Sequence, residues 1–328
     1  MSRVAQSKRL YVSDLDGTLL DNRARLSPFS RMSLTRLLNA GVAFTVATAR
    51  SAPAVRSILG DLPIGIPIIE QNGACVTDLA SGRHLLVNEL PLLLGRKVLA
   101  QFRRFAADPI AACIVDDVDR LLFEDPSNAG TRWYIDEKHR ANDPRLQRAA
   151  EVELDAHGQL LSLTTLVPET VGRSLASSLL TELGSAIQLR FGHNSYAPGF
   201  WELSVLGAAA TKSAAIAALR SELGMAEAEL VVFGDAENDM DMFRSADMAI
   251  AVENGVPELL GMATRIVASN VADGVARWLL DEHAEALGRA GAGVSVRPRR
   301  SVRDGQDAAA PSSRSGAERR SPPPASRR

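Results

Sequence analysis

Arg9-Leu-Tyr-Val-Ser-Asp-Leu-Asp-Gly-Thr18 is the stretch that decides the fold. Its first five residues are mostly apolar and β-prone, which predicts a buried strand over residues 9–13. Asp14, Asp16 and Gly17 then replace that pattern with two carboxylates and a turn residue. A buried strand that ends in a polar turn is typical of an open α/β sheet, in which ligands bind at the carboxyl ends of the strands.

Strand and helix patterns alternate on both sides of a long central segment. Ser27 and Pro28 supply an N-cap and an N1 proline for a helix that we expect to end near Ala40, with Gly41 as its C′ residue. Further strands and helices are expected at 42–48, 51–59, 66–69, 211–223, 230–233, 248–252, 256–262, 265–268 and 273–280. Apolar strands separated by helices predict an α/β fold, a Rossmann-like doubly wound parallel sheet.

The central segment differs, because hairpin-like pieces at 111–115 and 120–123 flank an acidic turn. A strand is expected at 160–167 and a helix at 169–183. We therefore expect an inserted α+β domain within a discontinuous sheet domain. The predicted boundaries are 1–79 for the first part of the core, 80–200 for the insertion, 201–287 for the second part of the core, and 288–328 for a tail.

The tail is rich in Arg, Ser, Pro and Ala, with ten arginines and three acidic residues from Arg289 onward. It has too few large apolar residues to offset the entropy of ordering, so we expect it to be disordered. Binding to an anionic partner is the less favoured alternative for this basic segment.

The composition bounds the rest of the function. The chain has 328 residues, 46% of them apolar and 23% charged, and a net charge of −2, which suits a globular protein of two domains without a nucleic-acid surface. Cys75 and Cys113 form neither a CxxC nor a Cys/His cluster, so a disulfide framework and a zinc site are not expected. No apolar run of signal-peptide or membrane-spanning length occurs. We expect a cytoplasmic protein that binds no membrane.

The acidic residues at the predicted strand ends have a spacing suited to phosphate chemistry. Near a phosphate, one carboxylate of Asp14 and Asp16 can act as a nucleophile and the other as a general acid and base. A second cluster, Gly234-Asp-Ala-Glu-Asn-Asp239, follows strand 230–233 and offers oxygen ligands to a hard cation. Thr48 ends another strand and Lys212 opens a helix, where a hydroxyl and an ammonium can bind a phosphate. A capped turn and a helix N-cap are the structural alternatives.

In this order, the four motifs resemble those of the haloacid dehalogenase superfamily. Ile69-Glu-Gln-Asn-Gly-Ala74 and Asn270-Val-Ala-Asp-Gly274 are similar to its Cof-type branch, and the likeness covers about residues 9–282. The insertion falls between Thr48 and Lys212, which in that family defines a C2 cap, and its texture resembles the B subtype of subfamily IIB.

The resemblance implies a metal and a role for each matching residue. Asp14 would be the nucleophile and a ligand of Mg²⁺, and Asp16 the general acid and base, with its backbone carbonyl on the metal. Asp235 would bind the metal directly, while Asn238 and Asp239 would complete the site by positioning a metal-bound water or the lysine.

The phosphate would be held by Thr48 and Lys212, with Asn238 nearby. Arg50 would either hold a substrate anion or pair with a surface residue. Two stretches depart from the family pattern, Thr48-Ala-Arg50 in place of Thr-Gly-Arg and Glu253-Asn-Gly255 in place of Asn-Ala. Neither departure replaces an expected catalytic carboxylate.

The function that these residues favour is a magnesium-dependent phosphatase acting on a small phosphomonoester, through an aspartyl-phosphate. Sugar phosphates, nucleotides and cofactor phosphates are the substrates that a capped site admits. The alternatives are a phosphosugar mutase and a non-catalytic protein that binds phosphorylated metabolites.

Within the insertion, three residues that precede the return to the core are the best candidates for substrate contact: His193, Asn194 and Tyr196. Two other groups are expected to be structural. The first is an acidic hairpin turn, Asp116, Asp117 and Asp119, and the second is a set of packing or loop residues, Trp133, Tyr134 and His139.

Overall fold

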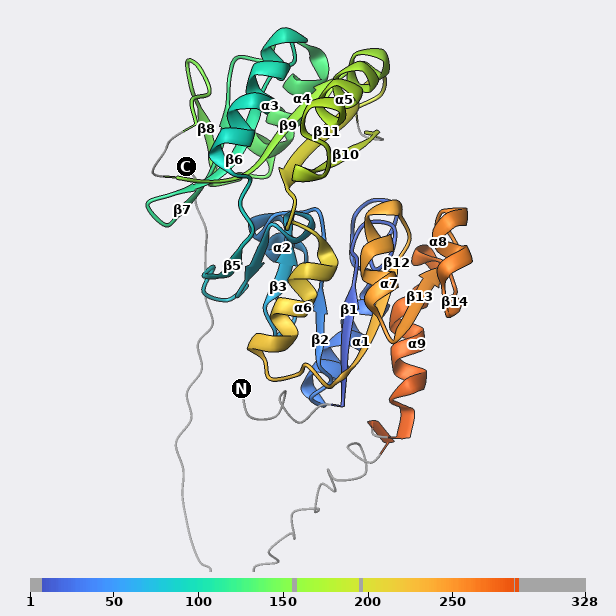
Figure 1. Cartoon of the computed structure of the whole chain (residues 1–328). Coiled ribbons are helices and arrows are strands. Elements are labelled where there is room, and N and C mark those ends of the chain that lie inside the picture. The colour runs from blue at the N-terminus through green and yellow to red at the C-terminus, as the bar shows by residue number, and fades with distance from the viewer. Residues whose placement is uncertain (1–7, 155–157, 195–196, 286, 289–328) are drawn as a thin grey trace, which may run out of the picture.

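The computed structural model describes residues 8–154, 158–194, 197–285 and 287–288. In Figure 1 these residues form a lower sheet domain, which contains both ends of the described chain, and an upper domain inserted within it. Of the predicted disordered tail, only Gly288 lies within the described residues.

The lower sheet is parallel throughout and has the order β14-β13-β12-β1-β2. Its strands are β1 (Arg9–Ser13), β2 (Phe44–Val46), β12 (Glu229–Gly234), β13 (Met248–Val252) and β14 (Arg265–Val267). The chain leaves β1 toward β2 on one side and later returns as β12 on the other. This reversal of strand order creates the crevice in which open α/β sheets bind ligands, and it confirms the predicted doubly wound sheet.

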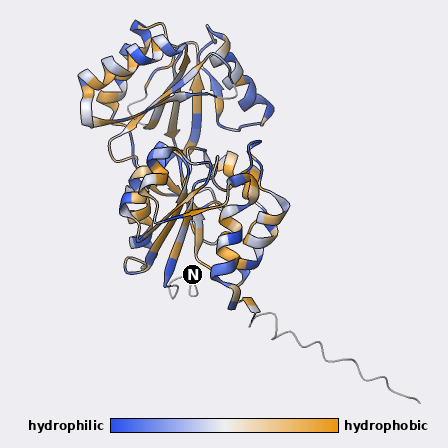
Figure 2. Ribbon diagram, turned by 90° about the vertical axis from the view of Figure 1, so that its right-hand side faces the viewer, coloured by the Kyte–Doolittle hydropathy of each residue, from blue (hydrophilic) through white to orange (hydrophobic). Residues whose placement is uncertain are grey.

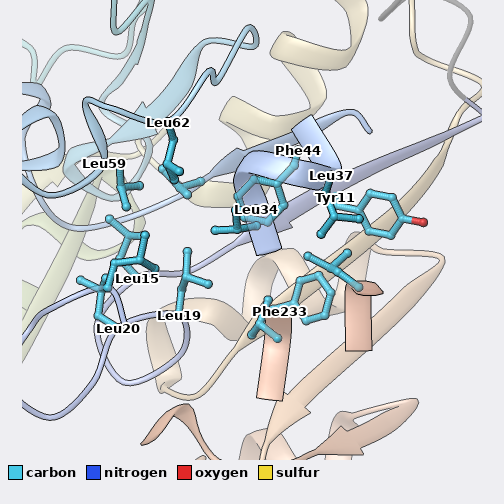
Figure 3. Packing of buried hydrophobic residues seen from close by; sticks show 14 of the residues in the cluster. Tyr11, Leu15, Leu19, Leu20, Leu34, Leu37, Phe44, Leu59, Leu62 and Phe233 are labelled. Atoms are coloured by element: carbon cyan, nitrogen blue, oxygen red, sulfur yellow. The ribbon is translucent and has the colours of Figure 1, made fainter. Parts of the chain in front are cut away.

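Helices cover both faces of this sheet because its buried strands are apolar on both sides. Tyr11, Phe44 and Phe233 pack on one face of the sheet with α1 (Pro28–Asn39), α2 (Ala52–Leu59) and α9 (Gly274–Glu282). Figure 3 shows these three side chains together with residues of α1 and α2. Leu10 and Val12 pack on the other face, against the remaining helices of the core. Those helices are α6 (Lys212–Glu222), α7 (Met240–Ser245) and α8 (Pro257–Met262).

The predicted start of α1 is confirmed, since the Ser27 side chain accepts a hydrogen bond from Ser30 N at 2.9 Å and Pro28 opens the helix. Gly41 and Gly224 follow α1 and α6 with positive φ, as predicted C′ glycines do. The strand expected at 42–48 is shorter and covers only Phe44–Val46.

A small antiparallel sheet extends the β2 edge of the core. It consists of β3 (Ile68–Glu70), β4 (Cys75–Thr77) and β5 (His84–Val87), and a parallel bridge between Ala47 and Ile69 joins it to the parallel sheet. The 3₁₀ turn Gln71–Gly73 connects β3 to β4.

Among the described residues, the inserted domain, hereafter the cap, consists of a six-stranded sheet and the helices α3 (Leu92–Arg104), α4 (Ala129–Arg140) and α5 (Glu169–Leu183), and it lies above the core in Figure 1. Its strand order is β10-β11-β9-β6-β7-β8, with the bounds β6 (Ile110–Val115), β7 (Val118–Phe123), β8 (Leu146–Arg148), β9 (Gln159–Val167), β10 (Ile187–His193) and β11 (Trp201–Gly207). This α+β insertion confirms the predicted fold class. The boundaries at 80 and 200 remain predictions. In the structure, β5 pairs with the small sheet and β11 pairs with the cap sheet.

The two faces of the cap sheet have different neighbours. The helices α3 (Leu92–Arg104) and α5 (Glu169–Leu183) cover one face. Part of α4 (Ala129–Arg140) and residues Ala74 and Cys75 of the core side pack on the other. In Figure 2 the strands of the lower domain are mostly apolar, and the helices of both domains have apolar and polar stretches. The second face of the cap sheet is therefore the one turned to the core.

The predicted acidic hairpin is confirmed, but its turn is shorter than the sequence suggested. Asp116 and Asp117 alone form the turn, with φ of 51° and 59°, which is the backbone of a tight two-residue hairpin. Asp119 already belongs to β7, where its Oδ1 lies 3.0 Å from His84 Nε2 of the small sheet. Its side chain therefore joins the cap to the core.

Cys75 and Cys113 are both buried, and no disulfide joins them in the part of the chain that the structure describes. Among the described residues, no helix has the length and apolar character needed to cross a membrane.

Candidate active site

The predicted site residues meet at the carboxyl edge of the parallel sheet. The strand register aligns Ser13 with Phe233 and with Val46, so the residues that follow β1, β12 and β2 emerge side by side. Asp14 N donates to Phe233 O at 2.9 Å, which ties the first acidic turn to the end of β12. Asp14, Asp235 and Thr48 therefore come together although the chain separates them widely.

Lys212 is the charged centre of this site and is fully buried at the first position of α6. Its Nζ donates to Asp14 Oδ1 and to Asp239 Oδ1, both at 2.6 Å. Burial alone would lower the pKa of Lys212, but the two carboxylates outweigh it and raise that pKa above its ordinary value. The side chain is thus held as an ammonium between the nucleophile candidate and the second acidic cluster.

Three carboxylates crowd together around this lysine. One oxygen each from Asp14, Asp235 and Asp239 lie within 4.8 Å of one another. Burial raises the pKa of Asp14, against the effect of Lys212, and burial also raises the pKa of Asp235 to about 6. Removal of such groups from water disfavours their charged forms unless a cation compensates, so the donor set fits a hard divalent cation.

Asp239 differs from its neighbours because both of its oxygens already accept hydrogen bonds. Oδ1 accepts from Lys212, and Oδ2 accepts from the backbone N of Asp235 at 3.0 Å and of Ala236 at 3.1 Å. Asp239 is therefore placed to position Lys212, which is one of the two roles that the resemblance implied.

The Asp-Gly-Thr turn is required by the close approach of the second acidic cluster. Gly17 has φ of 80°, and a Cβ at this position would overlap the Asp235 carboxylate. Thr18 Oγ1 donates to Asp235 Oδ1 at 2.7 Å, which orients that carboxylate. On the other side, Asn254 Nδ2 donates to Gly17 O at 2.7 Å. The departure at Glu253-Asn-Gly255 therefore retains a residue that holds the turn after Asp14.

Thr48 is buried at the end of β2, and its Oγ1 accepts from Arg50 N at 3.1 Å. The hydroxyl therefore keeps its own proton for donation to a phosphate oxygen. Thr48 O also accepts from Asn72 N at 2.9 Å. Asn238 Nδ2 donates to Asn72 Oδ1 at 3.1 Å, so Asn72 joins two of the predicted motifs.

Arg50 pairs with the predicted general acid. Its Nε donates to Asp16 Oδ2 at 2.7 Å and its Nη2 to Asp16 Oδ1 at 2.6 Å, a bidentate pair. Both residues are only partly buried. Of the two roles left open for Arg50, the structure shows a pairing with a carboxylate, and that carboxylate belongs to the site.

The cap candidates are only partly gathered at the site. Asn194 Nδ2 donates to Glu202 Oε2 at 3.3 Å, His193 is exposed against Trp201, and Tyr196 lies outside the described residues. Trp133 and Tyr134 pack on the core-facing side of the cap, where Tyr134 also lines a cavity, and exposed His139 contacts the Phe123 ring; their structural role remains a prediction.

Sequence reasoning did not assign several residues of the site. Asn72 lies inside the quoted Gln-Asn-Gly stretch, whose backbone has positive φ at each of its three residues. The dipeptide Asn-Gly within that stretch, whose residues accept positive φ more readily than most, was the signal from which this turn could have been found. A cavity between cap and core contains further polar residues without any motif, among them Lys138, Arg145 and Glu202.

Comparison with known proteins agrees with this geometry. The family model for haloacid dehalogenase-like hydrolases matches residues 11–279. A 5-amino-6-(5-phospho-D-ribitylamino)uracil phosphatase of Bacillus subtilis is 27% identical over 278 residues, which are 81% of this chain and 95% of that protein. An HMP-PP phosphatase of Cronobacter sakazakii is 27% identical over 77% of this chain and 86% of its own length.

A solved structure supports the fold. TM0651 from Thermotoga maritima superposes with a TM-score of 0.67 at 22% identity, covering 83% of this chain and 97% of that one. The range that the family model matches includes every motif residue from Asp14 to Asp239. The chain thus belongs to the family of haloacid dehalogenase-like hydrolases.

Proposed function

We propose that the chain is a magnesium-dependent phosphatase that hydrolyses a small phosphomonoester through an aspartyl-phosphate on Asp14. The observation that carries the proposal is the buried ammonium of Lys212, 2.6 Å from both Asp14 and Asp239, beside a third carboxylate. Both relatives described above are named as phosphatases, which supports the same chemistry.

In the first step an Asp14 carboxylate oxygen attacks phosphorus and forms the acyl phosphate as the ester P–O bond breaks. Asp16 donates a proton to the leaving oxygen, so the alcohol departs neutral. In the second step Asp16 takes a proton from water, whose oxygen attacks phosphorus. Inorganic phosphate leaves and the Asp14 carboxylate is restored.

The other residues bind and orient the phosphoryl group. Lys212 and the Thr48 hydroxyl supply a charge and a donor to its oxygens. Asp14, Asp235 and the Asp16 carbonyl would hold Mg²⁺, with Asn238 and Asp239 positioning its water or Lys212. Bound there, the ion would neutralise the carboxylates and the charge that develops on the phosphoryl oxygens.

The bidentate contact between Arg50 and Asp16 adds a conformational step to this scheme. Both Asp16 oxygens accept from the guanidinium, so one of these hydrogen bonds has to open before Asp16 can reach the leaving oxygen. Substrate binding in the adjoining cavity, which Arg50 also lines, is a suitable trigger. We place this activity in the cytoplasm, where buried Cys75 and Cys113 would remain thiols.

The test is release of inorganic phosphate from a panel of sugar phosphates, nucleotides and cofactor phosphates. The expected result is release that requires magnesium, stops with EDTA, and is lost in Asp14→Asn but kept in the matched cap control Asp116→Asn. A folded, magnesium-loaded wild type that releases no phosphate from any of these compounds, or an active Asp14→Asn variant, would refute the proposal.

A further inference from the structure

A cavity of about 140 Å³ lies between the cap and the core, next to the catalytic residues. Two residues connect it to the site. Arg50 lines the cavity and pairs with Asp16, and Asn72 lines it and accepts from Asn238. A substrate whose phosphate lies at Asp14 would therefore extend its leaving group into this space.

The cap sheet contributes a row of hydrogen-bonding side chains to the cavity. Ser162 and Thr164 on β9, and Glu202 and Ser204 on β11, are alternate residues of their strands and so lie on the same face. Thr164 and Ser204 are directly paired, with their hydroxyl oxygens 2.8 Å apart. Such a row can bind several ligand hydroxyls at once, because each hydroxyl both donates and accepts.

Positive charge enters the cavity from other elements of the cap. Buried Arg145 is neutralised by a bidentate pair with Asp143, at 3.0 and 2.8 Å. Lys138 on α4 is partly buried, and its Nζ lies 4.9 Å from the centre of the Tyr134 ring. The ion pairs among the described residues include none for Lys138. Asp143 and Glu202 attract its charge only from beyond ion-pair distance, so a ligand anion could make the direct contact.

The energetics of Lys138 favour an anionic partner. Burial lowers the pKa of Lys138 and nearby Arg145 lowers it further, against the effect of Asp143 and Glu202, so its ammonium is held there at a cost. A ligand anion would offset that cost, and a neutral ligand would not. The cavity volume is also below the roughly 300 Å³ of the smallest common ligand pockets, which favours a compact leaving group.

We infer that this cavity binds the leaving group as a small polyhydroxylated acid, with its anionic group at Lys138 and its hydroxyls along Ser162, Thr164, Ser204 and Glu202. The inference rests on the proposed function and deepens it by naming the substrate class. It assigns Lys138 as the residue that distinguishes acidic from neutral polyol phosphates.

The test compares three phosphoesters that differ in these features. 6-Phosphogluconate has hydroxyls and a carboxylate, sorbitol 6-phosphate has hydroxyls alone, and 4-nitrophenyl phosphate has neither. Because a hydrogen bond to a charged group contributes about 1.5–3 kcal/mol, we expect kcat/KM of the wild type to favour 6-phosphogluconate over sorbitol 6-phosphate about tenfold or more. Lys138→Met should bring this ratio close to one.

The matched control is Lys97→Met, which removes an exposed lysine of α3 that pairs with Glu182, away from the cavity. This control should keep the wild-type ratio. Thr164→Val should lower kcat/KM for both polyol phosphates relative to that for 4-nitrophenyl phosphate. Equal preference in the wild type, or a Lys138→Met variant that keeps the acidic preference, would overturn the inference.

Two readouts separate this inference from the proposed function. Hydrolysis of 4-nitrophenyl phosphate reports the phosphatase activity alone, because this compound lacks the features that the cavity would recognise. Calorimetric titration of the full-length Asp14→Asn variant with 6-phosphogluconate and sorbitol 6-phosphate reports recognition without turnover. Tighter binding of the acid that depends on Lys138 upholds the inference even without turnover, and equal binding refutes it.

Discussion

The catalytic edge of the core and the cavity face of the cap both gather charged side chains, but they treat charge differently. In the core, Lys212 lies between Asp14 and Asp239, which accept hydrogen bonds from it at 2.6 Å. In the cap, Lys138 lies over an aromatic ring and has no ion pair among the described residues. The core site thus resembles a preorganised electrostatic frame, whereas the cap site requires a ligand to complete it.

This contrast separates chemistry from recognition. A buried charge with partners is fixed in place and can stabilise the same phosphoryl group in any substrate. A partly buried charge without a partner gains most from a ligand of opposite sign, so it can distinguish one leaving group from another. The four predictions below test the contrast, from the largest expected effect to the smallest.

The largest effect is expected from Asp14→Asn, because the amide cannot act as the nucleophile. The value of kcat for 4-nitrophenyl phosphate should fall by about 10⁴-fold or more, while the circular dichroism spectrum remains that of the wild type. Asp116→Asn, in the cap turn, is the matched control and should keep the wild-type rate. Comparable rates for the two variants would contradict the assignment of the nucleophile.

The second prediction compares the two lysines through stability. Lys212→Met leaves the carboxylates of Asp14 and Asp239 buried without their cation, so the free energy of unfolding should fall by about 3–5 kcal/mol. Lys138→Met removes a charge without an ion-pair partner, so the change should be within about 1 kcal/mol. Urea denaturation of both variants measures the difference. Equal losses would show that the two sites treat charge alike.

The third prediction concerns Arg50, which lies where the two regions meet. Arg50→Lys keeps the charge but loses the planar guanidinium that lines the cavity and orients Asp16, so weaker substrate binding should outweigh the easier release of Asp16 and kcat/KM should fall by about tenfold. The pair is partly exposed, so the free energy of unfolding should change by less than about 1 kcal/mol. Arg56→Lys, on α2, is the matched control and should keep kcat/KM, because the Arg56 side chain donates only to Leu79 O among the hydrogen bonds of the described residues.

The smallest effect is expected from the contact between His84 and Asp119, which joins the small sheet of the core to the cap. The hydrogen bond with Asp119 raises the pKa of His84 above its usual 6.5. Because the folded pKa is the higher one, the stabilisation is fully present below about pH 6.5 and is lost as the pH rises through the folded value.

Urea denaturation at pH 6 and pH 9 tests this sign. The difference in the free energy of unfolding between the wild type and Asp119→Asn should be larger at pH 6 than at pH 9. A difference that is the same at both pH values would show that the contact does not depend on the protonation of His84.

Much of the core could be predicted because its signals are local. Apolar strands, Ser27-Pro28 and Gly41 each mark an element by the backbone or side-chain chemistry of a few residues. The catalytic residues follow those strands directly, so their convergence follows from a parallel sheet. The cap was harder, since α3 and α4 were not predicted. The predicted acidic turn was two residues too long. Asp119 was placed in it because Asp is common in turns, whereas the structure pairs Asp119 with Ile114 as part of β7.

The sequence by itself determined the doubly wound sheet, the order of the four motifs and the residues from Asp14 to Asp239 that serve them. Only the tertiary structure decided which cap residues face the site. Lys138, Arg145 and Glu202 come from α4, the segment before β8, and β11, and they meet because strand pairing and helix packing bring distant parts of the chain together. No periodicity or spacing encodes such a meeting, because it depends on the register of the whole cap sheet.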